Sequence, residues 1–213
     1  MAESSPRTIA VWDPLIRIGH WLIVACFIVA YFTEGRPEWL HSWAGYLIAI
    51  TVALRVVWGF VGPGHARFSN FVTSPGEGFN YLLDLFTGRA KRHVGHSPAG
   101  GLMTLALLFM LAVITGSGMA TLAAQKGHGP LAGIVAQVPR TDAAVTTQPA
   151  TGDDEGGDGE RRGPRTVWKE VHELAVNFTL LLIVLHVAGV VVASVAHREN
   201  LARSMVTGRK RAP

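Results

Sequence analysis

The chain has 213 residues, of which 49% are hydrophobic and 16% are charged, and its formal net charge at pH 7 is +4. Its single cysteine, Cys26, excludes a disulfide bond within the chain, and we expect it to be an ordinary packing residue. The basic residues stand beside apolar segments. A basic tail next to a membrane indicates contact with anionic lipid, which argues against nucleic-acid binding.

The hydrophobic residues occur in blocks, each long enough to cross the roughly 30 Å hydrocarbon layer of a membrane as a helix. These blocks cover residues 14–33, 39–61, 101–124 and 171–196. The first has Asp13 as its expected N-cap and Pro14 at its first helical position. It lacks a small-residue cleavage site, so we expect it to remain in the mature protein. The pattern predicts an all-α integral membrane protein, a four-helix bundle in one transmembrane domain over residues 1–213.

The segments between the blocks differ in character. The second loop alternates aromatic and polar residues at 66–71 and 79–86, which predicts short helices at the membrane interface. Residues 125–165 form a glycine-rich, acidic loop that we expect to be disordered and periplasmic. This loop is interpreted as a solvated connector or, alternatively, as an acidic dock for a basic electron carrier. Residues 198–205 are expected to continue the fourth helix.

Lysine and arginine are concentrated on one side of the predicted spans. The N-terminal segment, the second loop and the C-terminal tail contribute Arg7, Arg67, Arg89, Lys91, Arg92, Arg198, Arg203, Arg209, Lys210 and Arg211. The short first loop contributes only Arg36, and the long third loop carries little weight in such a count. Cytoplasmic loops have this basic excess. We therefore expect both termini in the cytoplasm and a multi-pass protein of the cell inner membrane.

Four histidines lie inside the apolar blocks or at their ends, where an ionisable side chain is costly and usually functional. They are His20, His41, His172 and His186. The last two are 14 residues apart, which is nearly four helical turns and about 21 Å, so both rings point the same way. Following the chain through the membrane matches His20 with His186 towards the cytoplasm, and His41 with His172 towards the periplasm. Each pair joins two helices, as bis-histidine ligation requires, so two stacked haems are the first candidate cofactors.

Several further residues are expected near these histidines. Arg55 follows His41 by 14 residues, which predicts a buried position near the cytoplasmic pair, where a haem propionate would neutralise it. The alternative for Arg55 is a side chain that extends to the lipid headgroups. Arg17 and Lys169 flank the same sites, and they are expected either to meet propionates or to anchor the helices at the interface.

Glycine residues adjoin the ligand candidates at Gly19, Gly45 and Gly189. We expect them to clear space for a flat macrocycle, although membrane helices also use glycine for helix packing. The remaining histidines lie in loops or at helix ends, where solvated side chains are expected: His65, His93, His96, His128 and His197. His96 is of most interest among them because it precedes the third span. No motif for hydrolase or nucleotide chemistry is present, and no Cys-x-x-Cys-His exists for covalent haem attachment.

Together, several short motifs resemble the bacterial cytochrome b561 family, which includes the b-type cytochrome subunits of nickel–iron hydrogenases. The motifs are Val11-Trp-Asp-Pro, Arg17-Ile-Gly-His-Trp21, His41-Ser-Trp-Ala-Gly-Tyr46, Arg55-Val-Val-Trp-Gly-Phe-Val-Gly62, Ala66-Arg-Phe68, Gly95-His-Ser-Pro-Ala-Gly100 and His197-Arg-Glu-Asn-Leu201 with Thr207-Gly-Arg-Lys210. The resemblance covers nearly all of the chain except about 125–165. It implies a bundle that binds two non-covalent haem b groups through the same four histidines, and electron transfer between quinone and a partner.

Three functions remain open at this point. The leading one is a dihaem subunit that transfers electrons between the quinone pool and a periplasmic partner, which is a hydrogenase-like complex or a soluble cytochrome. This role is favoured over that of a free-standing enzyme. The second is a stand-alone superoxide:quinone oxidoreductase, which needs a positively charged funnel to the outer haem; the acidic loop argues mildly against it. The third is a histidine-based metal transporter or sensor, which is disfavoured because the spans lack the acidic residues expected in a cation pathway.

Overall fold

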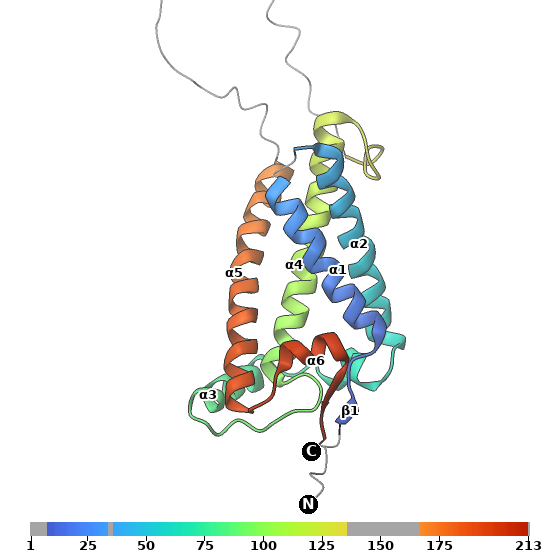
Figure 1. The fold of residues 1–213 in the computed structure, drawn as a ribbon. Coiled ribbons are helices and arrows are strands. Elements are labelled where there is room, and N and C mark those ends of the chain that lie inside the picture. Colours follow the sequence, from blue (N-terminus) through green and yellow to red (C-terminus); the bar gives the residue numbers. More distant parts are fainter. Residues whose placement is uncertain (1–7, 34–35, 136–166, 213) are drawn as a thin grey trace, which may run out of the picture.

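Four long helices dominate the computed structural model, which describes residues 8–33, 36–135 and 167–212 (Figure 1). They are α1 (Pro14–Thr33), α2 (Glu38–Val61), α4 (Pro98–Lys126) and α5 (Val167–Ala196). Each is long and apolar enough to cross a membrane, in agreement with the sequence prediction. The structure extends α4 through Lys126, so the predicted third loop begins later than expected. Most of that loop, including its acidic run, lies outside the described residues.

The helices form two packed pairs. α1 packs on α2, α4 packs on α5, and contacts between α2 and α4 join the pairs. Their shared core contains Cys26 of α1, Ala44, Ile48 and Val52 of α2, and Leu111 of α4. The outward faces are apolar as well. Such surfaces are favourable only in lipid, so the protein is a multi-pass membrane protein.

The start of α1 follows the sequence prediction. Pro14 is the first helical residue, and the Asp13 side chain accepts a hydrogen bond from the amide of Ile16 at 3.1 Å. The second carboxylate oxygen of Asp13 accepts from the indole N–H of Trp58 at 3.1 Å. This N-cap therefore also fixes the first turn of α1 against the last turns of α2.

Short elements close the end of the bundle at which both described chain ends lie (Figure 1). They are two 3₁₀ turns, η1 (Gly64–Ala66) and η2 (Phe68–Asn70), the helices α3 (Pro75–Phe86) and α6 (Leu201–Thr207), and the strands β1 (Thr8–Ala10) and β2 (Arg209–Arg211). The strands pair antiparallel. A capping box between Ser74 and Glu77 starts α3 earlier than the predicted residue 79. The all-α prediction describes the long elements but misses the strands.

The predicted continuation of the fourth helix is wrong. α5 ends at Ala196, and Arg198 has a positive φ of 49°, which a continuing right-handed helix does not allow. Asn200 then caps a separate helix, α6, by accepting from the amide of Arg203 at 2.7 Å. Gly208 ends α6 in the left-handed conformation, with φ of 78°. This turn allows the C-terminal residues to reach β1.

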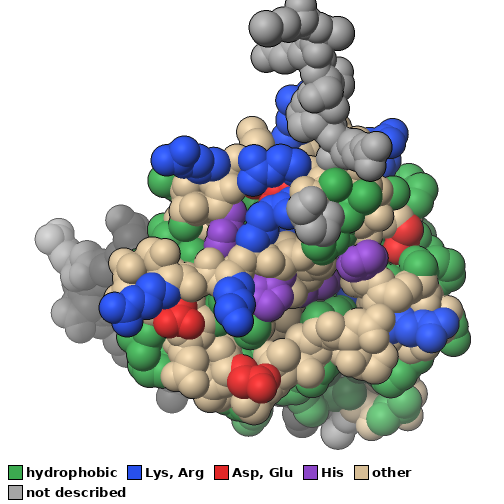
Figure 2. Space-filling view, turned by 90° about the horizontal axis from the view of Figure 1, so that it is seen from below, with side chains coloured by type: hydrophobic (Ala, Val, Ile, Leu, Met, Phe, Trp, Pro, Cys, Tyr) green, Lys and Arg blue, Asp and Glu red, His purple; other side chains and the backbone are tan. Residues whose placement is uncertain are grey.

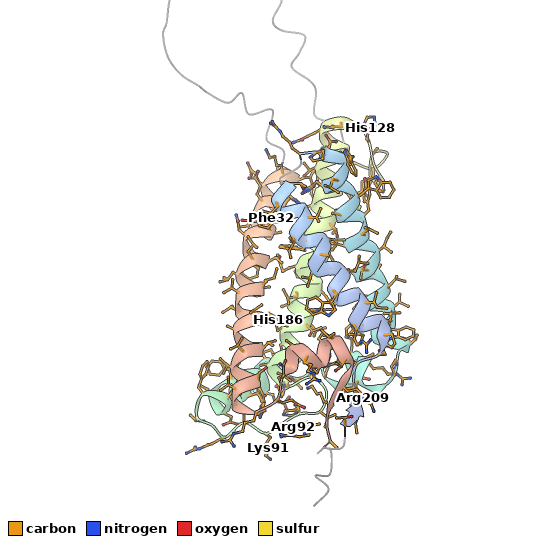
Figure 3. All side chains as sticks on the ribbon, in the orientation of Figure 1. Phe32, Lys91, Arg92, His128, His186 and Arg209 are labelled. Atoms are coloured by element: carbon orange, nitrogen blue, oxygen red, sulfur yellow. The ribbon has the colours of Figure 1, made fainter. Side chains whose placement is uncertain are left out.

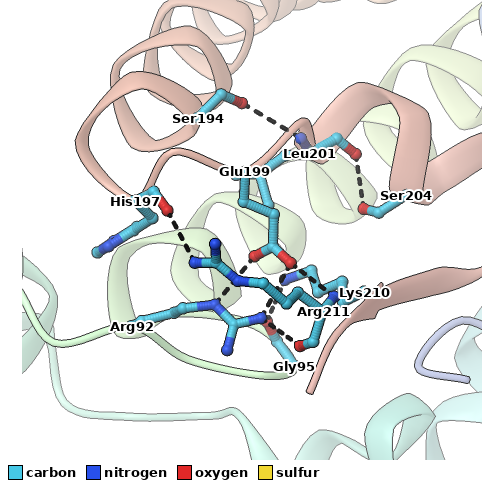
Figure 4. Close-up of polar contacts among 9 residues, drawn as sticks. All are labelled: Arg92, Gly95, Ser194, His197, Glu199, Leu201, Ser204, Lys210 and Arg211. Atoms are coloured by element: carbon cyan, nitrogen blue, oxygen red, sulfur yellow. Dashed lines mark hydrogen bonds and ion pairs between the residues drawn. The ribbon is translucent and has the colours of Figure 1, made fainter. Parts of the chain in front are cut away.

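An ion-pair network joins the second loop to the C-terminal tail (Figure 4). The Arg92 guanidinium donates to Glu199 at 2.9 Å and also to the carbonyl of Arg211, whose own amide donates to Glu199 at 3.0 Å. The buried Lys210 ammonium donates to the carbonyl of Gly95 at 3.4 Å. Burial would raise the pKa of Glu199, but these hydrogen bonds and the charges of Arg92 and Lys210 outweigh it and lower the pKa.

Candidate cofactor-binding site

His41 and His172 face each other at the end of the bundle opposite the chain ends. His41 stands in the first turn of α2 and His172 in the second turn of α5, and their ring centres are 6.2 Å apart with planes inclined by 69°. Two imidazoles on opposite sides of one metal ion, each with a nitrogen about 2 Å from it, have ring centres about 6 Å apart. The spacing of this outer pair therefore fits a single metal ion between the rings.

Hydrogen bonds fix the protonation state of both outer rings. Nδ1 of His41 lies 2.9 Å from the carbonyl oxygen of Ala30 on α1. Nδ1 of His172 lies 2.9 Å from the carbonyl oxygen of Ile114 on α4 and 3.3 Å from the hydroxyl of Ser117. Because a carbonyl only accepts, each Nδ1 is assigned the proton. Each Nε2 then has its lone pair free, which is the form that binds a metal.

His20 and His186 form the second, inner pair. The two half-buried rings, from α1 and α5, are close enough to interact electrostatically, and His186 lies in the half of the bundle nearer the chain ends (Figure 3). Trp21 contacts the His20 ring edge-on at 5.1 Å. Nδ1 of His20 is buried and has no hydrogen-bond partner among the residues that the structure describes. The structure thus brings the four predicted histidines together in the two pairs expected from depth.

Two imidazoles are too few to hold a bare metal ion. Structural and catalytic sites for such ions use three or four protein ligands. Within residues 8–33, 36–135 and 167–212, no group of three or more His, Cys, Asp or Glu side chains is arranged for a metal ion. A pair of axial imidazoles suffices for haem, in which the porphyrin supplies the other four ligands. The donor set therefore fits haem better than a transported ion.

The glycine residues beside the ligands have different surroundings. A Cβ atom at Gly45 or Gly189 would meet no atom within 4 Å in the described part of the chain, so both leave open space. A Cβ at Gly19 would lie 3.2 Å from the Thr51 methyl group, which indicates helix packing instead. Sequence reasoning missed Gly118, where a Cβ would lie 3.1 Å from Cε1 of His172.

Arg55 lies inside the bundle near the inner pair's end. Its side chain is only 9% exposed, and its guanidinium carbon is 5.1 Å from the ring centre of Phe68 and 6.0 Å from that of Phe71. It does not reach out to the surface as a headgroup-seeking arginine would. Asp13 attracts it electrostatically, yet its Nη1 is buried and has no hydrogen-bond partner in the described part of the chain. A buried, incompletely paired guanidinium is suited to an anionic group of a cofactor.

Comparisons with known proteins identify the family of the chain. The family model for prokaryotic cytochrome b561 matches residues 11–208. The chain belongs to the prokaryotic cytochrome b561 family. Over 142 residues the cytochrome is 29% identical to a probable Ni/Fe-hydrogenase B-type cytochrome subunit of Rhizobium leguminosarum bv. viciae. The alignment covers 52% of this chain. The chain aligns with 59% of that relative's length. No solved structure matches it significantly.

The family assignment indicates the cofactor class. The chain is a membrane protein of a b-type cytochrome family, and this family implies b-type haem. The expected contact with membrane lipid follows from the four apolar helices. The number of haems, their ligands and the redox partners remain predictions.

The two other basic residues predicted for the cofactor lie at opposite ends of the cytochrome. Arg17 is beside the C-terminal turn, where a Cβ at Gly208 would crowd its Nη1, and its Nε is buried without a partner. Lys169 forms an ion pair with Glu173 one turn later, at 3.7 Å. Arg17 therefore has a donor available for a propionate, and the roles of both residues stay predictions.

His96 is a half-buried histidine outside the two pairs, and its Nδ1 atom is buried. Its ring contacts Trp12 edge-on at 4.7 Å and lies over Phe71 at 4.2 Å, and its Nδ1 has no hydrogen-bond partner. Burial lowers the pKa of His96 to about 3, and the positive charges of Arg55, Lys210 and His65 act in the same direction. The imidazole is therefore neutral at physiological pH, although it is close enough to Arg55 and Lys210 to interact electrostatically with both.

Proposed function

We propose that this cytochrome holds two haem b groups, one between His41 and His172 and one between His20 and His186, and carries electrons across the membrane. The single observation that supports this most strongly is the 6.2 Å separation of the outer rings, with both Nδ1 atoms hydrogen-bonded and both Nε2 atoms free. Bound haem would supply a one-electron iron couple. With a histidine on each face, a bound haem would have no open coordination position, which would suit the chain to outer-sphere electron transfer rather than oxygen activation.

The protein's own residues would tune this site. Backbone carbonyls hold the outer imidazoles by their Nδ1 protons and prevent them from rotating. The buried guanidinium of Arg55 offers an unpaired donor and a positive charge near the inner pair. We infer that Arg55 and Arg17 bind propionate groups of the inner haem and that Lys169 binds a propionate group of the outer haem. A positive charge in a low-dielectric site favours the reduced, more negative state.

The basic surface supports a cytoplasmic location for the chain ends. Figure 2 shows lysine and arginine side chains gathered on the face that carries α3, α6 and the strands. The exposed lysine and arginine residues at this end of the bundle are Arg67, Arg89, Lys91, Arg198, Arg203, Arg209 and Arg211. Basic residues favour the cytoplasmic side of an inner membrane, so we place the outer pair on the periplasmic side.

We propose a periplasmic redox protein as one partner and the quinone pool as the other. The curated relative is described as a probable Ni/Fe-hydrogenase cytochrome subunit, which makes a hydrogenase-like complex the first partner to test. A small soluble cytochrome is the alternative partner. The superoxide:quinone oxidoreductase reading differs in needing no protein partner at all.

For the test, the protein is expressed with added haem and then purified. We expect reduced-minus-oxidised absorption bands of haem b and a haem-to-protein ratio of two by pyridine haemochrome. We also expect a short-chain quinone to oxidise the dithionite-free reduced protein. A ratio of one, or reduced protein that quinones leave unchanged, contradicts the corresponding part of the proposal. Rapid reduction by superoxide in the absence of any partner would favour the stand-alone enzyme.

A further inference from the structure

Helix α4 supplies none of the four paired histidines, yet it makes the closest contacts to one of them. The Ile114 carbonyl oxygen lies 2.9 Å from Nδ1 of His172, and the Ser117 hydroxyl lies 3.3 Å from the same atom. Gly118 faces the ring edge, where a Cβ would lie 3.1 Å from Cε1 and 3.2 Å from Nδ1. Three residues on one face of α4 thus surround one side of a single imidazole.

The hydrogen-bond directions around Ser117 are determined by its other partners. Its hydroxyl donates to the carbonyl of Val113 at 2.6 Å, with a second carbonyl, that of Ile114, at 3.1 Å. The one hydroxyl proton is therefore used within the helix, which leaves the oxygen lone pairs to accept from His172. Ser117 is 4% exposed, so water does not compete for this hydrogen bond. The Nδ1 proton of His172 is shared between two acceptors.

Within residues 8–33, 36–135 and 167–212, two of the other paired histidines, His41 and His20, lack this second acceptor on Nδ1. His41 has a single carbonyl partner, and Nδ1 of His20 is buried with none. A second acceptor on Nδ1 increases the electron donation of the imidazole through its other nitrogen. Stronger donation stabilises the oxidised state of a bound iron and lowers its potential.

We propose that Ser117 is a positioning residue that, with Gly118, fixes the rotation of His172 and lowers the potential of the outer haem. This rests on the proposed function, because it requires that His172 is an axial ligand. Gly118 permits the close approach of the ring, and Ser117 holds the ring once it is there. The role of α4 in the outer site is thus to orient a ligand that α5 carries.

The test is a redox titration of purified Ser117→Ala with the haem spectra as readout. Loss of one acceptor should make reduction of the outer haem more favourable, roughly threefold to tenfold in its equilibrium constant, the range expected for one hydrogen bond. At 59 mV per tenfold, the midpoint rises accordingly. The low-spin ferric EPR signal of the outer haem should shift as the ring gains freedom, and the inner haem should be unchanged.

Matched variants separate positioning from a general packing effect. Thr115→Val removes another buried hydroxyl of α4, which bonds only to carbonyls of its own helix at 2.9 and 3.3 Å, so both potentials should stay at their wild-type values. Ser117→Thr keeps the hydroxyl and should restore the wild-type outer potential. Gly118→Ala should displace the ring and lower outer-haem occupancy, whereas Gly116→Ala, in open space on the same helix, should not.

Three outcomes would overturn the inference for different reasons. If His172→Ala loses one haem but Ser117→Ala leaves the outer potential and its EPR signal unchanged, Ser117 does not act on the ligand. If Thr115→Val shifts the outer potential as much as Ser117→Ala does, the effect belongs to α4 packing. If His172→Ala retains both haems, the proposed ligation itself fails, and the role of Ser117 fails with it.

Discussion

His172 on α5 is anchored by a carbonyl of α4, while His41 on α2, 6.2 Å away from it between ring centres, is anchored by a carbonyl of α1. The outer pair therefore draws on all four long helices, two for the imidazoles and two for their acceptors. α5 packs mainly on α4, so this arrangement needs the correct docking of both helix pairs. Substitution of His20 at the inner pair offers a cleaner first test, because its Nδ1 has no hydrogen-bond partner among the described residues, whereas the outer rings are held by backbone carbonyls.

We expect His20→Ala and His186→Ala each to remove one haem and to leave the other in place. Each substitution takes away one of two axial ligands of the inner site, whereas the outer rings and their carbonyl acceptors are untouched. The haem-to-protein ratio from pyridine haemochrome should fall from two to one. A ratio that stays at two in either variant would show that the pairing is wrong.

We expect Gly45→Ala and Gly189→Ala to weaken haem binding without destabilising the polypeptide. Their Cβ positions are empty within the described part of the chain, so a methyl group costs little in the protein alone and improves helix propensity. If the macrocycle occupies that space, overpacking should reduce its affinity about fivefold or more. Haem titration of each purified variant measures this.

The control for these variants is Gly116→Ala, whose Cβ also meets open space but whose residue is exposed on α4. Its haem content should equal that of the wild type. Equal haem affinity in all three alanine variants would place the macrocycle away from Gly45 and Gly189.

We expect Arg55→Leu to lower the potential of the inner haem and to leave the outer one nearly unchanged. A unit charge about 10 Å away at an effective dielectric constant of about 20 contributes roughly 1–2 kcal/mol. This corresponds to a shift on the order of 50 mV for a one-electron couple. Spectroscopic redox titration resolves the two haems.

Two further variants complete the Arg55 experiment. Arg55→Lys retains the charge and should shift the potential much less, even though it loses the contact with Phe68. Arg203→Leu removes an exposed charge from the same end of the molecule and should have no effect, because solvent screens it. If the potential of the inner haem is the same in Arg55→Leu and in the wild type, Arg55 does not lie close to that haem.

We expect the C-terminal tail to detach at acidic pH. The pKa of Glu199 is lowered in the folded protein, so its ion pair stabilises the tail fully above the ordinary glutamate pKa of about 4.3. The stabilisation is lost as the pH falls through the lower, folded pKa. The protection factors of the β2 amides, which are corrected for the intrinsic pH dependence of exchange, should therefore fall below about pH 4. Glu199→Gln should exchange faster at neutral pH and show little of this pH dependence; an unchanged profile would exclude Glu199 as its source.

Local sequence patterns were enough to predict the spans and the N-cap of α1. Apolar blocks of sufficient length and the Asp13–Pro14 pair are short-range signals, and the structure realises both. The burial of Arg55 also followed from its helical spacing to His41. The break after Ala196 was missed because no change in the local hydrophobic pattern indicates it. It depends on Arg198 adopting a positive φ and on the pairing of β2 with β1, a contact between the two ends of the chain.

The sequence by itself determined which helices cross the membrane, which histidines they carry and at what depth, because rise per residue and hydrophobic length are properties of a single helix. Only the tertiary structure decided which nitrogen of each outer ring is engaged, that Ser117 and Gly118 of α4 contact His172, and that Nδ1 of His20 is left alone. These facts depend on the rotation and distance of neighbouring helices, and the packing of side chains from distant segments fixes both.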